Sequence, residues 1–239
     1  MDNGVYIAAS RQLALFRDMD TTANNIANMS TVGYQSEHMI FDDYMVDDRV
    51  GSNMHFANDL ATYRETMQGG IKVTDNPLDF AISGKGYFVV QTPLGDRYTR
   101  AGNFTMDDQG TLVTIEGYPV LDASNQTIVF EPDAQTIEAN SDGTIRVNGE
   151  DFTVLGMVEF ENDQLLERHG AKFYSSDAEP VAATNSELAQ GALETSNVAA
   201  VKELTHMIKV SKATASTAKF IEVMYDLQRR NTQMWTQQR

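Results

Sequence analysis

The last stretch of the chain, residues 191–239, most constrains the fold. It contains no proline and, after Gly191, no glycine. Two rows of residues recur within it at steps of three and four, the spacing that places side chains on one face of an α-helix. This spacing predicts a helix from Asn197 to about Asn231, with Ser196 or Asn197 as its capping residue. The first row is Met207, Val210, Thr214, Thr217, Ile221 and Met224, and the second is Val201, Leu204, Ile208, Ser211, Ala215 and Ala218.

A helix of this length needs a long partner. It would span roughly 50 Å at 1.5 Å per residue, so it cannot bury its stripes against itself. The other candidate lies between Gly4 and Gly33, where the same spacing recurs, and the termini are predicted to pair with each other or with those of neighbouring subunits. Small and polar seam residues favour contact with several helices over a two-stranded zipper. A helical hairpin that closes a monomeric domain is the alternative. The N-terminal row is Leu15, Met19, Thr22, Ile26 and Met29.

The middle of the chain differs from the two ends in its glycine content and in its hydrophobic pattern. Thirteen of the sixteen glycines lie within residues 69–191, and short apolar–polar alternations separate the turns. Residues 87–90 and 97–100 read as strands on either side of a Pro-Leu-Gly-Asp turn, and Asn148-Gly149 separates two further alternating runs. Asn-Gly between such runs is a strong hairpin signal. The interval is therefore predicted to be an all-β domain of short antiparallel strands.

These patterns predict an α+β fold, in which long N- and C-terminal helices pair as a coiled coil and an all-β domain is inserted between them. The predicted divisions are residues 1–36 for the N-terminal helix, 37–74 for an extended linker, 75–180 for the β-domain, and 181–239 for a return segment and the C-terminal helix. The linker is inferred from aspartates interleaved with isolated aromatic residues.

The charge balance excludes several kinds of partner. The net charge is −16, with −19 in residues 37–197 and +4 in residues 198–239. An acidic body argues against nucleic-acid binding, which needs a basic surface, and against direct lipid binding at anionic membranes. The N-terminus shows no basic segment followed by an apolar one, so no cleaved signal peptide is expected. No apolar run approaches the length needed to span a membrane.

The residues that carry chemistry do not form a recognisable site. The chain has no cysteine, which excludes disulfides, thiolate catalysis and Cys-ligated zinc. Its four histidines, His38, His55, His169 and His206, lie in four segments, and none has a metal-ligand partner at helical spacing. Residues 84–86, Gly-Lys-Gly, lack the third glycine and the helix of a phosphate loop. We predict no catalytic residue, no cofactor and no metal site, and hence no enzyme.

Four sequence blocks resemble the signatures of flagellar rod and hook proteins. Residues 23–34, Ala-Asn-Asn-Ile-Ala-Asn-Met-Ser-Thr-Val-Gly-Tyr, are similar to ANNLAN-x-x-T-x-G-F/Y. Residues 76–88 resemble NPLD-x-AI-x-G-x-GFF, residues 98–104 resemble YTR-x-G-x-F, and residues 191–198 resemble G-x-LE-x-SNV. The resemblance covers nearly the whole chain. The length and the first six residues are most similar to the proximal-rod branch of the family.

The resemblance implies a structural axial subunit of the bacterial flagellar basal-body rod. Its partners would be copies of itself, other flagellar rod proteins and the flagellar type III export apparatus, and it would lie in the periplasmic space after export. The terminal helices would pack in the inner tube, be partly disordered in the free subunit, and order on assembly. The residues expected at the assembly interface are Leu15, Met19, Ile26, Asn24, Asn25, Asn28, Leu204, Met207, Ile208, Ile221 and Met224.

Two alternatives remain at this point. A distal-rod or hook-type subunit is disfavoured, because residues 211–215 replace the Arg-Ala-Tyr-Glu-like run of the distal rod protein and because hook proteins are longer. Gln35 stands where many relatives have a basic residue. A secreted binding module is the rival from another class. It would need a groove lined by aromatic residues such as Tyr87, Phe88, Tyr98 and Tyr118, which we instead expect to be core residues.

Overall fold

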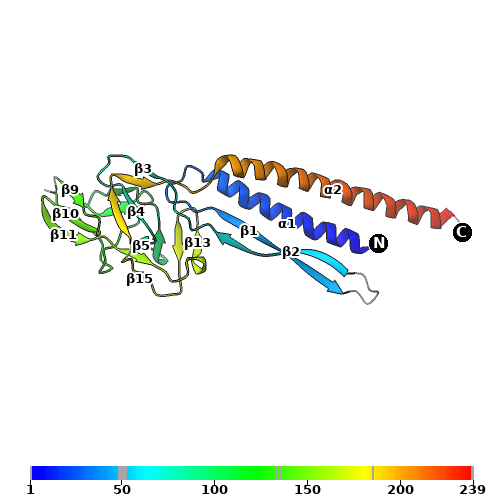
Figure 1. Ribbon diagram of the computed structural model, residues 1–239, viewed down its shortest axis with the longest axis horizontal. Helices are drawn as coiled ribbons and strands as arrows, with labels where there is room; N and C mark the ends of the chain where they lie inside the picture. Colours follow the sequence, from blue (N-terminus) through cyan, green and yellow to red (C-terminus); the bar gives the residue numbers. More distant parts are fainter. Residues whose placement is uncertain (1, 48–52, 133, 135, 185, 238–239) are drawn as a thin grey trace. The chain divides into compact units, whose positions relative to one another are not determined.

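The computed structural model describes residues 2–47, 53–132, 134, 136–184 and 186–237, and in chain order a helix precedes and a helix follows a β-rich region (Figure 1). Helix α1 spans Asp2–Ala27 and helix α2 spans Ala200–Gln237. The inserted strands are short and antiparallel, so the predicted α+β class is confirmed. Among the described residues, neither helix contains a segment apolar enough to cross a membrane.

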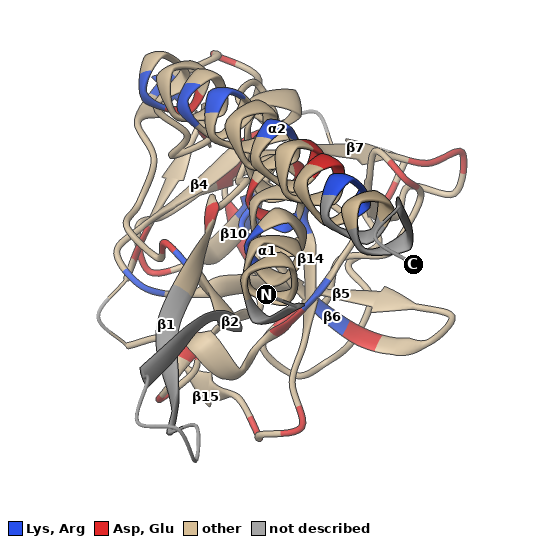
Figure 2. Ribbon diagram, turned by 90° about the vertical axis from the view of Figure 1, so that its right-hand side faces the viewer, with Lys and Arg blue, Asp and Glu red and all other residues tan. Residues whose placement is uncertain are grey.

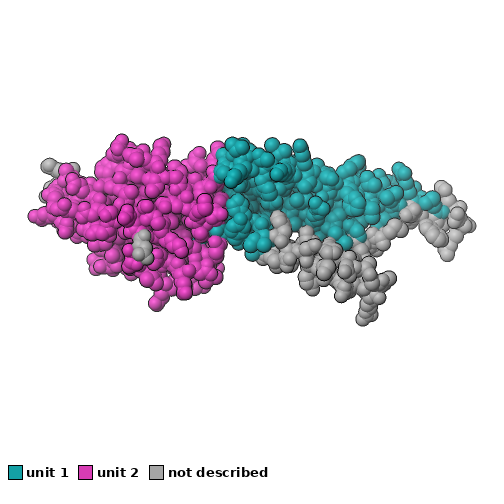
Figure 3. Space-filling view, in the orientation of Figure 1, with its two compact units in different colours: residues 1–27, 37–64, 199–239 teal, residues 28–36, 65–198 magenta. Residues whose placement is uncertain are grey.

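The chain forms two compact units, which Figure 3 colours separately. The first contains residues 1–27, 37–64 and 199–239, and the second contains residues 28–36 and 65–198. The chain therefore passes repeatedly between the units. The predicted division at residues 36, 74 and 180 follows the chain in order, and it stays a prediction.

The first unit combines the two helices with a hairpin of strands β1 (Glu37–Asp47) and β2 (Asn53–Arg64). This region was expected to be an extended linker. Opposite charges face each other where the hairpin begins, at Glu37 and Arg64, and the next pair joins the rings of His38 and Tyr63 with centroids 5.4 Å apart. Such cross-strand pairs stabilise a hairpin. These pairs could not be recognised from the sequence, because the two residues of each pair are far apart along the chain.

The second unit is built of short strands in several small sheets. The largest has six strands in the order β13-β14-β6-β5-β12-β15, and a three-stranded sheet has the order β11-β10-β9. Two-stranded pairs are β16-β4, β17-β3 and β7-β8. The strands are β3 (Ile71–Val73), β4 (Phe80–Ser83), β5 (Tyr87–Thr92), β6 (Gly95–Thr99), β7 (Phe104–Met106), β8 (Leu112–Thr114), β9 (Ile137–Ala139), β10 (Thr144–Val147), β11 (Glu150–Val154), β12 (Met157–Glu159), β13 (Glu167–His169), β14 (Phe173–Ser175), β15 (Val181–Ala182), β16 (Glu187–Gln190) and β17 (Ala192–Glu194), with a 3₁₀ turn at Asp163–Leu165.

The predicted hairpins of this unit are confirmed. Strand β5 pairs with β6 across the Pro-Leu turn, and β10 pairs with β11. Asn148 and Gly149 join β10 to β11 with φ of 52° and 89°. Positive φ at both central residues is what a two-residue type I′ loop requires, and Asn-Gly tolerates it best.

Aromatic and aliphatic side chains fill the core of the second unit. Tyr87, Phe88 and Tyr98, which a binding groove would have exposed, are buried. Tyr87 packs edge-on against Phe160 and Tyr174, and Phe88 against Phe104. The half-buried Tyr118 packs edge-on against Phe173. Tyr87, Phe88 and Tyr98 are therefore core residues, as expected, whereas Tyr118 is only half-buried, and the four do not line one exposed groove.

Candidate assembly interface

Helices α1 and α2 run antiparallel in the first unit. One end of the contact is at Gly4, where an added Cβ would lie 3.7 Å from Met224 Cε, and the other is at Asn25, whose Nδ2 donates to Glu203 Oε2 at 3.3 Å. Between them, His206 Nε2 lies 2.9 Å from Asp18 Oδ1. The first row of α2 faces this contact, because its residues are buried or half-buried along their length.

The second row of α2 is exposed. Val201, Leu204 and Ile208 are 79%, 51% and 56% exposed, and the smaller Ser211, Ala215 and Ala218 that continue the row are exposed too. The two rows therefore have different environments within one chain. The inner row packs on α1, and the outer row presents apolar surface to its surroundings.

Helix α1 has an outer row of its own, which sequence analysis missed. Tyr6, Leu13 and Phe16 are 68%, 63% and 44% exposed. They belong to a run at steps of three and four that continues through Asp20 and is exposed throughout. This row has the same spacing as the others and could have been found from it. It was overlooked because the neighbouring row through Leu15 and Met19 is more apolar. The full row is Tyr6, Ala9, Leu13, Phe16, Asp20, Ala23 and Ala27.

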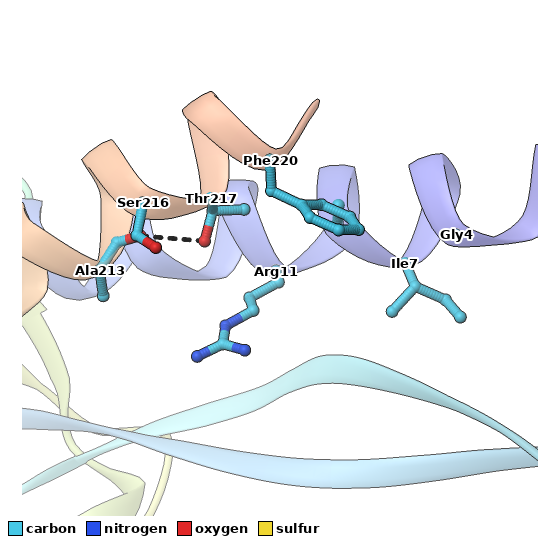
Figure 4. Close-up of a pocket in the computed structure, with 8 residues that line it drawn as sticks. Gly4, Ile7, Arg11, Ala213, Ser216, Thr217 and Phe220 are labelled. Atoms are coloured by element: carbon cyan, nitrogen blue, oxygen red, sulfur yellow. Dashed lines mark hydrogen bonds between the residues drawn. The ribbon is translucent and has the colours of Figure 1, made fainter. Parts of the chain in front are cut away.

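A groove of about 440 Å³ runs between the two helices (Figure 4). On the α1 side it is lined by Gly4, Ile7 and Arg11, and on the α2 side by Ala213 and Phe220 among others. Thr217 donates its hydroxyl hydrogen to the Ala213 carbonyl at 2.9 Å, which satisfies a polar group inside the groove. Small residues keep the groove open, because Gly4 and Ala213 project little or nothing into it.

Exposed charges on α2 are mostly basic, as the recurring blue bands of Figure 2 show. Lys202, Lys209, Lys212 and Lys219 are all exposed. Over its described span α2 carries a net charge of +3, whereas α1 carries −1. Opposite net charges favour the pairing of α1 with α2 over the pairing of two α2 helices.

The predicted interface residues fall into three environments. Most of the apolar ones are half-buried, whereas Leu204 and Ile208 are exposed on the outer row. Of the asparagines, Asn25 is buried, Asn28 is half-buried and Asn24 is exposed. Their role in binding another subunit stays a prediction. The half-buried apolar residues are Leu15, Met19, Ile26, Met207, Ile221 and Met224.

Asn25 fixes the point at which β1 begins. Its Oδ1 accepts from the Glu37 backbone N–H at 3.0 Å, and its Nδ2 donates to the Glu37 carbonyl at 2.8 Å. The side-chain amide thus imitates the two hydrogen bonds of a strand neighbour. Glutamine or aspartate could not make this pair without moving or losing a donor. Asn25 thus satisfies backbone groups twelve residues farther along the chain.

The predicted cap of α2 is wrong. Helix α2 begins at Ala200, and the backbone N–H groups of Lys202 and Glu203 donate to the Ala199 carbonyl instead of to a side chain. Asn197 lies in the second unit and binds other backbone groups. Its Oδ1 accepts from the Ser36 N–H at 2.7 Å, and its Nδ2 donates to the carbonyls of Glu65 and Met67. Two other segments, at residue 36 and at residues 65–67, therefore bind the side chain that was predicted to cap the helix.

Within the second unit, all four signature blocks contribute to the surroundings of one buried ion pair. Arg100 Nη1 lies 3.5 Å from Glu194 Oε2, with the side chains 4% and 1% exposed. The Gly33 N–H donates to the Glu194 carbonyl at 2.9 Å, and the Gly69 N–H donates to Oε1 at 3.1 Å. Arg100 also donates to the Gly84 carbonyl at 2.8 Å. The blocks at residues 23–34, 76–88, 98–104 and 191–198 therefore meet around this pair.

Burial raises the pKa of the Glu194 carboxyl above its ordinary value of 4.5, because loss of water outweighs the attraction of Arg100 and the Gly69 hydrogen bond. The folded protein then binds more protons than the unfolded chain between 4.5 and the raised pKa. The contribution of this carboxyl to the free energy of unfolding is complete below pH 4.5. It is lost as pH rises through the raised pKa, by at most about 1.4 kcal/mol per pH unit.

We expect Glu194→Gln to remove this part of the pH dependence. Glutamine does not titrate, so the free energy of unfolding of the wild type should rise relative to that of the variant as pH falls toward 4.5. Urea unfolding of both proteins from pH 4.5 to 7 measures it. A difference that stays constant over this range would show that Glu194 does not titrate there.

Three family models match successive parts of the chain. Residues 5–35 match "Flagella basal body rod protein", residues 81–147 match "Flagellar hook protein FlgE/F/G D1 domain", and residues 189–234 match "Flagellar basal body rod FlgEFG protein C-terminal". The flagellar basal-body rod protein FlgF of Mesorhizobium japonicum is 37% identical over 91% of both chains. This chain belongs to the family of flagellar basal-body rod proteins.

Other relatives of this rod protein support the same assignment. FlgF of Caulobacter vibrioides is 33% identical over 96% of both chains, and FlgG of Bacillus subtilis is 32% identical over 85% of this chain and 88% of the relative. The protein is FlgF-like, and it is a structural rod subunit of the flagellar basal body rather than an enzyme. The first and last matched regions contain the two helices whose outer rows are exposed.

Proposed function

We propose that this rod subunit polymerises through its terminal helices, which pair as a coiled coil and build part of the proximal rod with copies of themselves and other rod proteins. The observation that carries the proposal is the exposed apolar row on each helix, at Leu13 and Phe16 on α1 and at Leu204 and Ile208 on α2. Apolar rows of heptad spacing that are not covered within the chain are typical of helices that associate with other helices.

The contacts between subunits would be heterologous. An α1 surface that binds a different surface on the next copy leaves a free site at each end, so the assembly extends instead of closing. The subunit would reach the periplasmic space through the flagellar type III export apparatus, and helices that finish packing only on assembly suit passage as an extended chain. The resemblance to exported axial proteins supports this route.

We expect Leu204→Asp to block rod assembly. The substitution places a charge in the outer row of α2, where burial against a neighbour would leave it unpaired at a cost of several kcal/mol. Swimming in soft agar and the amount of the chain in purified basal bodies measure the effect, and both should be lost.

Thr205→Asp is the matched control. Thr205 is exposed and follows Leu204 directly, but it lies about 100° farther round the helix, outside the row. It adds the same charge to the same turn, and rods should still form. Normal swimming of the Leu204→Asp strain, or equal loss in both strains, would rule out the outer row as an assembly surface.

We also expect the terminal helices to be poorly protected from amide exchange in the free subunit. The inner contact contains polar residues such as Thr214 and Asp18, and each helix keeps one apolar row exposed. Hydrogen exchange read by segment should show residues 75–180 protected while residues 5–27 and 200–225 exchange within minutes. Equal protection of the helices in the free subunit would favour a finished monomeric hairpin. The same measurement tests the predicted division of the chain at residues 36, 74 and 180.

A further inference from the structure

The outer rows of α1 and α2 are complementary in size. The α1 row is bulky in its first half, at Tyr6, Leu13 and Phe16, and small in its second half, at Ala23 and Ala27. The α2 row is also bulky first and small second, with Val201, Leu204 and Ile208 followed by Ser211, Ala215 and Ala218. When two such rows run antiparallel, each bulky half faces a small half, which is the arrangement that packs without voids or overlap.

We propose that the outer row of α1 in one copy packs antiparallel on the outer row of α2 in a second copy, with Leu13 against Ala215 and Ala23 against Leu204. This seam rests on the proposed function and specifies its register. Phe16 then lies against Ser211, and Ala27 against Val201. Within one chain α1 and α2 are already antiparallel, so two copies with the same orientation meet in this way without either being turned over.

Other registers fit less well. A shift of one heptad in one direction puts Leu13 against Ile208 and Phe16 against Leu204, so that bulky residues collide. The opposite shift puts Leu13 against the exposed carboxylate of Glu222 and leaves Ala23 facing Ser211, small against small. In the proposed register Asp20, the one charged residue of the α1 row, faces Ile208 one helical turn from the exposed Lys212.

The charges favour α1, rather than a second α2, as the helix that packs on the outer row of α2. Two α2 helices in contact would bring together two surfaces of net charge +3, each with four exposed lysines, whereas α1 carries −1. The two outer rows also lie away from the contact inside the chain: Leu13 is five residues from Asp18, about 140° round the helix from the side that meets His206. The seam therefore adds to the internal contact without competing with it.

Cysteine cross-linking tests this seam cleanly, because the chain has no cysteine of its own. A full-length chain with Leu13→Cys and Ala215→Cys should form, on mild oxidation of flagellated cells, a ladder of dimers, trimers and longer chains on a non-reducing gel. Cells that co-express the two single variants should give dimers only, and each single variant alone should give monomer. This pattern distinguishes a heterologous contact from an isologous one.

The control is Leu13→Cys with Ser216→Cys. Ser216 is exposed at nearly the same height as Ala215 but lies about 100° round the helix, and no ladder is expected from this pair. A ladder from the control pair, dimers from one single variant, or monomer from the Leu13–Ala215 pair in cells that still build rods would overturn the seam. If rods form, and Leu204→Asp still blocks them, the proposed function survives that result while this register does not.

A size exchange provides a second test that does not depend on oxidation. Ala215→Leu should overfill the seam and reduce swimming at least tenfold in spread area, because Leu13 occupies that place. Adding Leu13→Ala should restore most of the loss, since the bulky and small residues have then changed sides. If Leu13→Ala worsens the Ala215→Leu strain, the two residues do not face each other. If the variant with Leu13→Cys and Ala215→Cys fails to enter rods, this size exchange still tests whether Leu13 faces Ala215.

Discussion

Replacing Glu194 with alanine is expected to destabilise the second unit by about 3–5 kcal/mol, the usual loss when one partner of a buried ion pair is removed. Arg100 would keep its charge, because a guanidinium cannot give up its proton in a protein, and it would remain 4% exposed without the carboxylate. The Gly69 N–H would lose its acceptor as well. Urea unfolding followed by far-ultraviolet circular dichroism measures the difference.

Two comparisons separate burial from charge. Asp151→Ala removes the acidic partner of Arg146 from a pair whose side chains are 38% and 75% exposed, and it should cost less than about 1 kcal/mol. Arg100→Ala should cost less than Glu194→Ala, because a buried carboxyl can take up a proton. If Glu194→Ala and Asp151→Ala cost the same, the pair at Arg100 is not buried as the structure has it.

Replacing Gly33 with alanine is expected to destabilise the second unit by roughly 2–5 kcal/mol, the sum of a left-handed backbone cost and an overpacking cost. Gly33 has φ of +67°, and an added Cβ would lie 2.4 Å from the Ala101 backbone nitrogen and 2.5 Å from the Arg100 carbonyl carbon. Backbone atoms cannot rotate away as a side chain can. The change would also strain the N–H of Gly33 that donates to Glu194.

Gly117→Ala is the matched control for this substitution. Gly117 has φ of +86°, but a Cβ there would meet nothing within 4 Å. Only the conformational cost of about 1–2 kcal/mol is expected. The midpoint of thermal unfolding reports both variants. Equal losses for Gly33→Ala and Gly117→Ala would mean that the close approach of residues 100–101 contributes nothing.

Much of the fold was predictable because its signals are local. Gly33, in the turn after the first helix, has φ of +67°, the left-handed region that glycine adopts most readily. The hairpin around Asn148-Gly149 was predicted from two residues and their flanking alternation, and it is confirmed. The hairpin β1–β2 was not predicted, because its matching pairs are separated by up to 27 positions and aspartates interrupt the alternation.

The candidate interface was predicted in part. Its residue rows were found on α2 by their spacing, but the spacing did not tell which row faces α1. That choice depends on the partner helix: Val210 and Thr217 are buried against α1, whereas Leu204 is half exposed. The outer row of α1 had the same spacing and was overlooked beside a more apolar one.

The sequence by itself determined the two terminal helices, the short hairpins between them and the membership of the rod family. These features depend on helical periodicity, turn chemistry and short signatures, each of which is complete within a few neighbouring residues. Only the tertiary structure decided that Asn197 ties three segments together instead of capping α2, that Glu194 pairs with Arg100, and that each helix keeps one apolar row exposed. Those choices are made by partners 94 or more positions apart, whose approach depends on the packing of the whole unit and leaves no pattern in the local sequence.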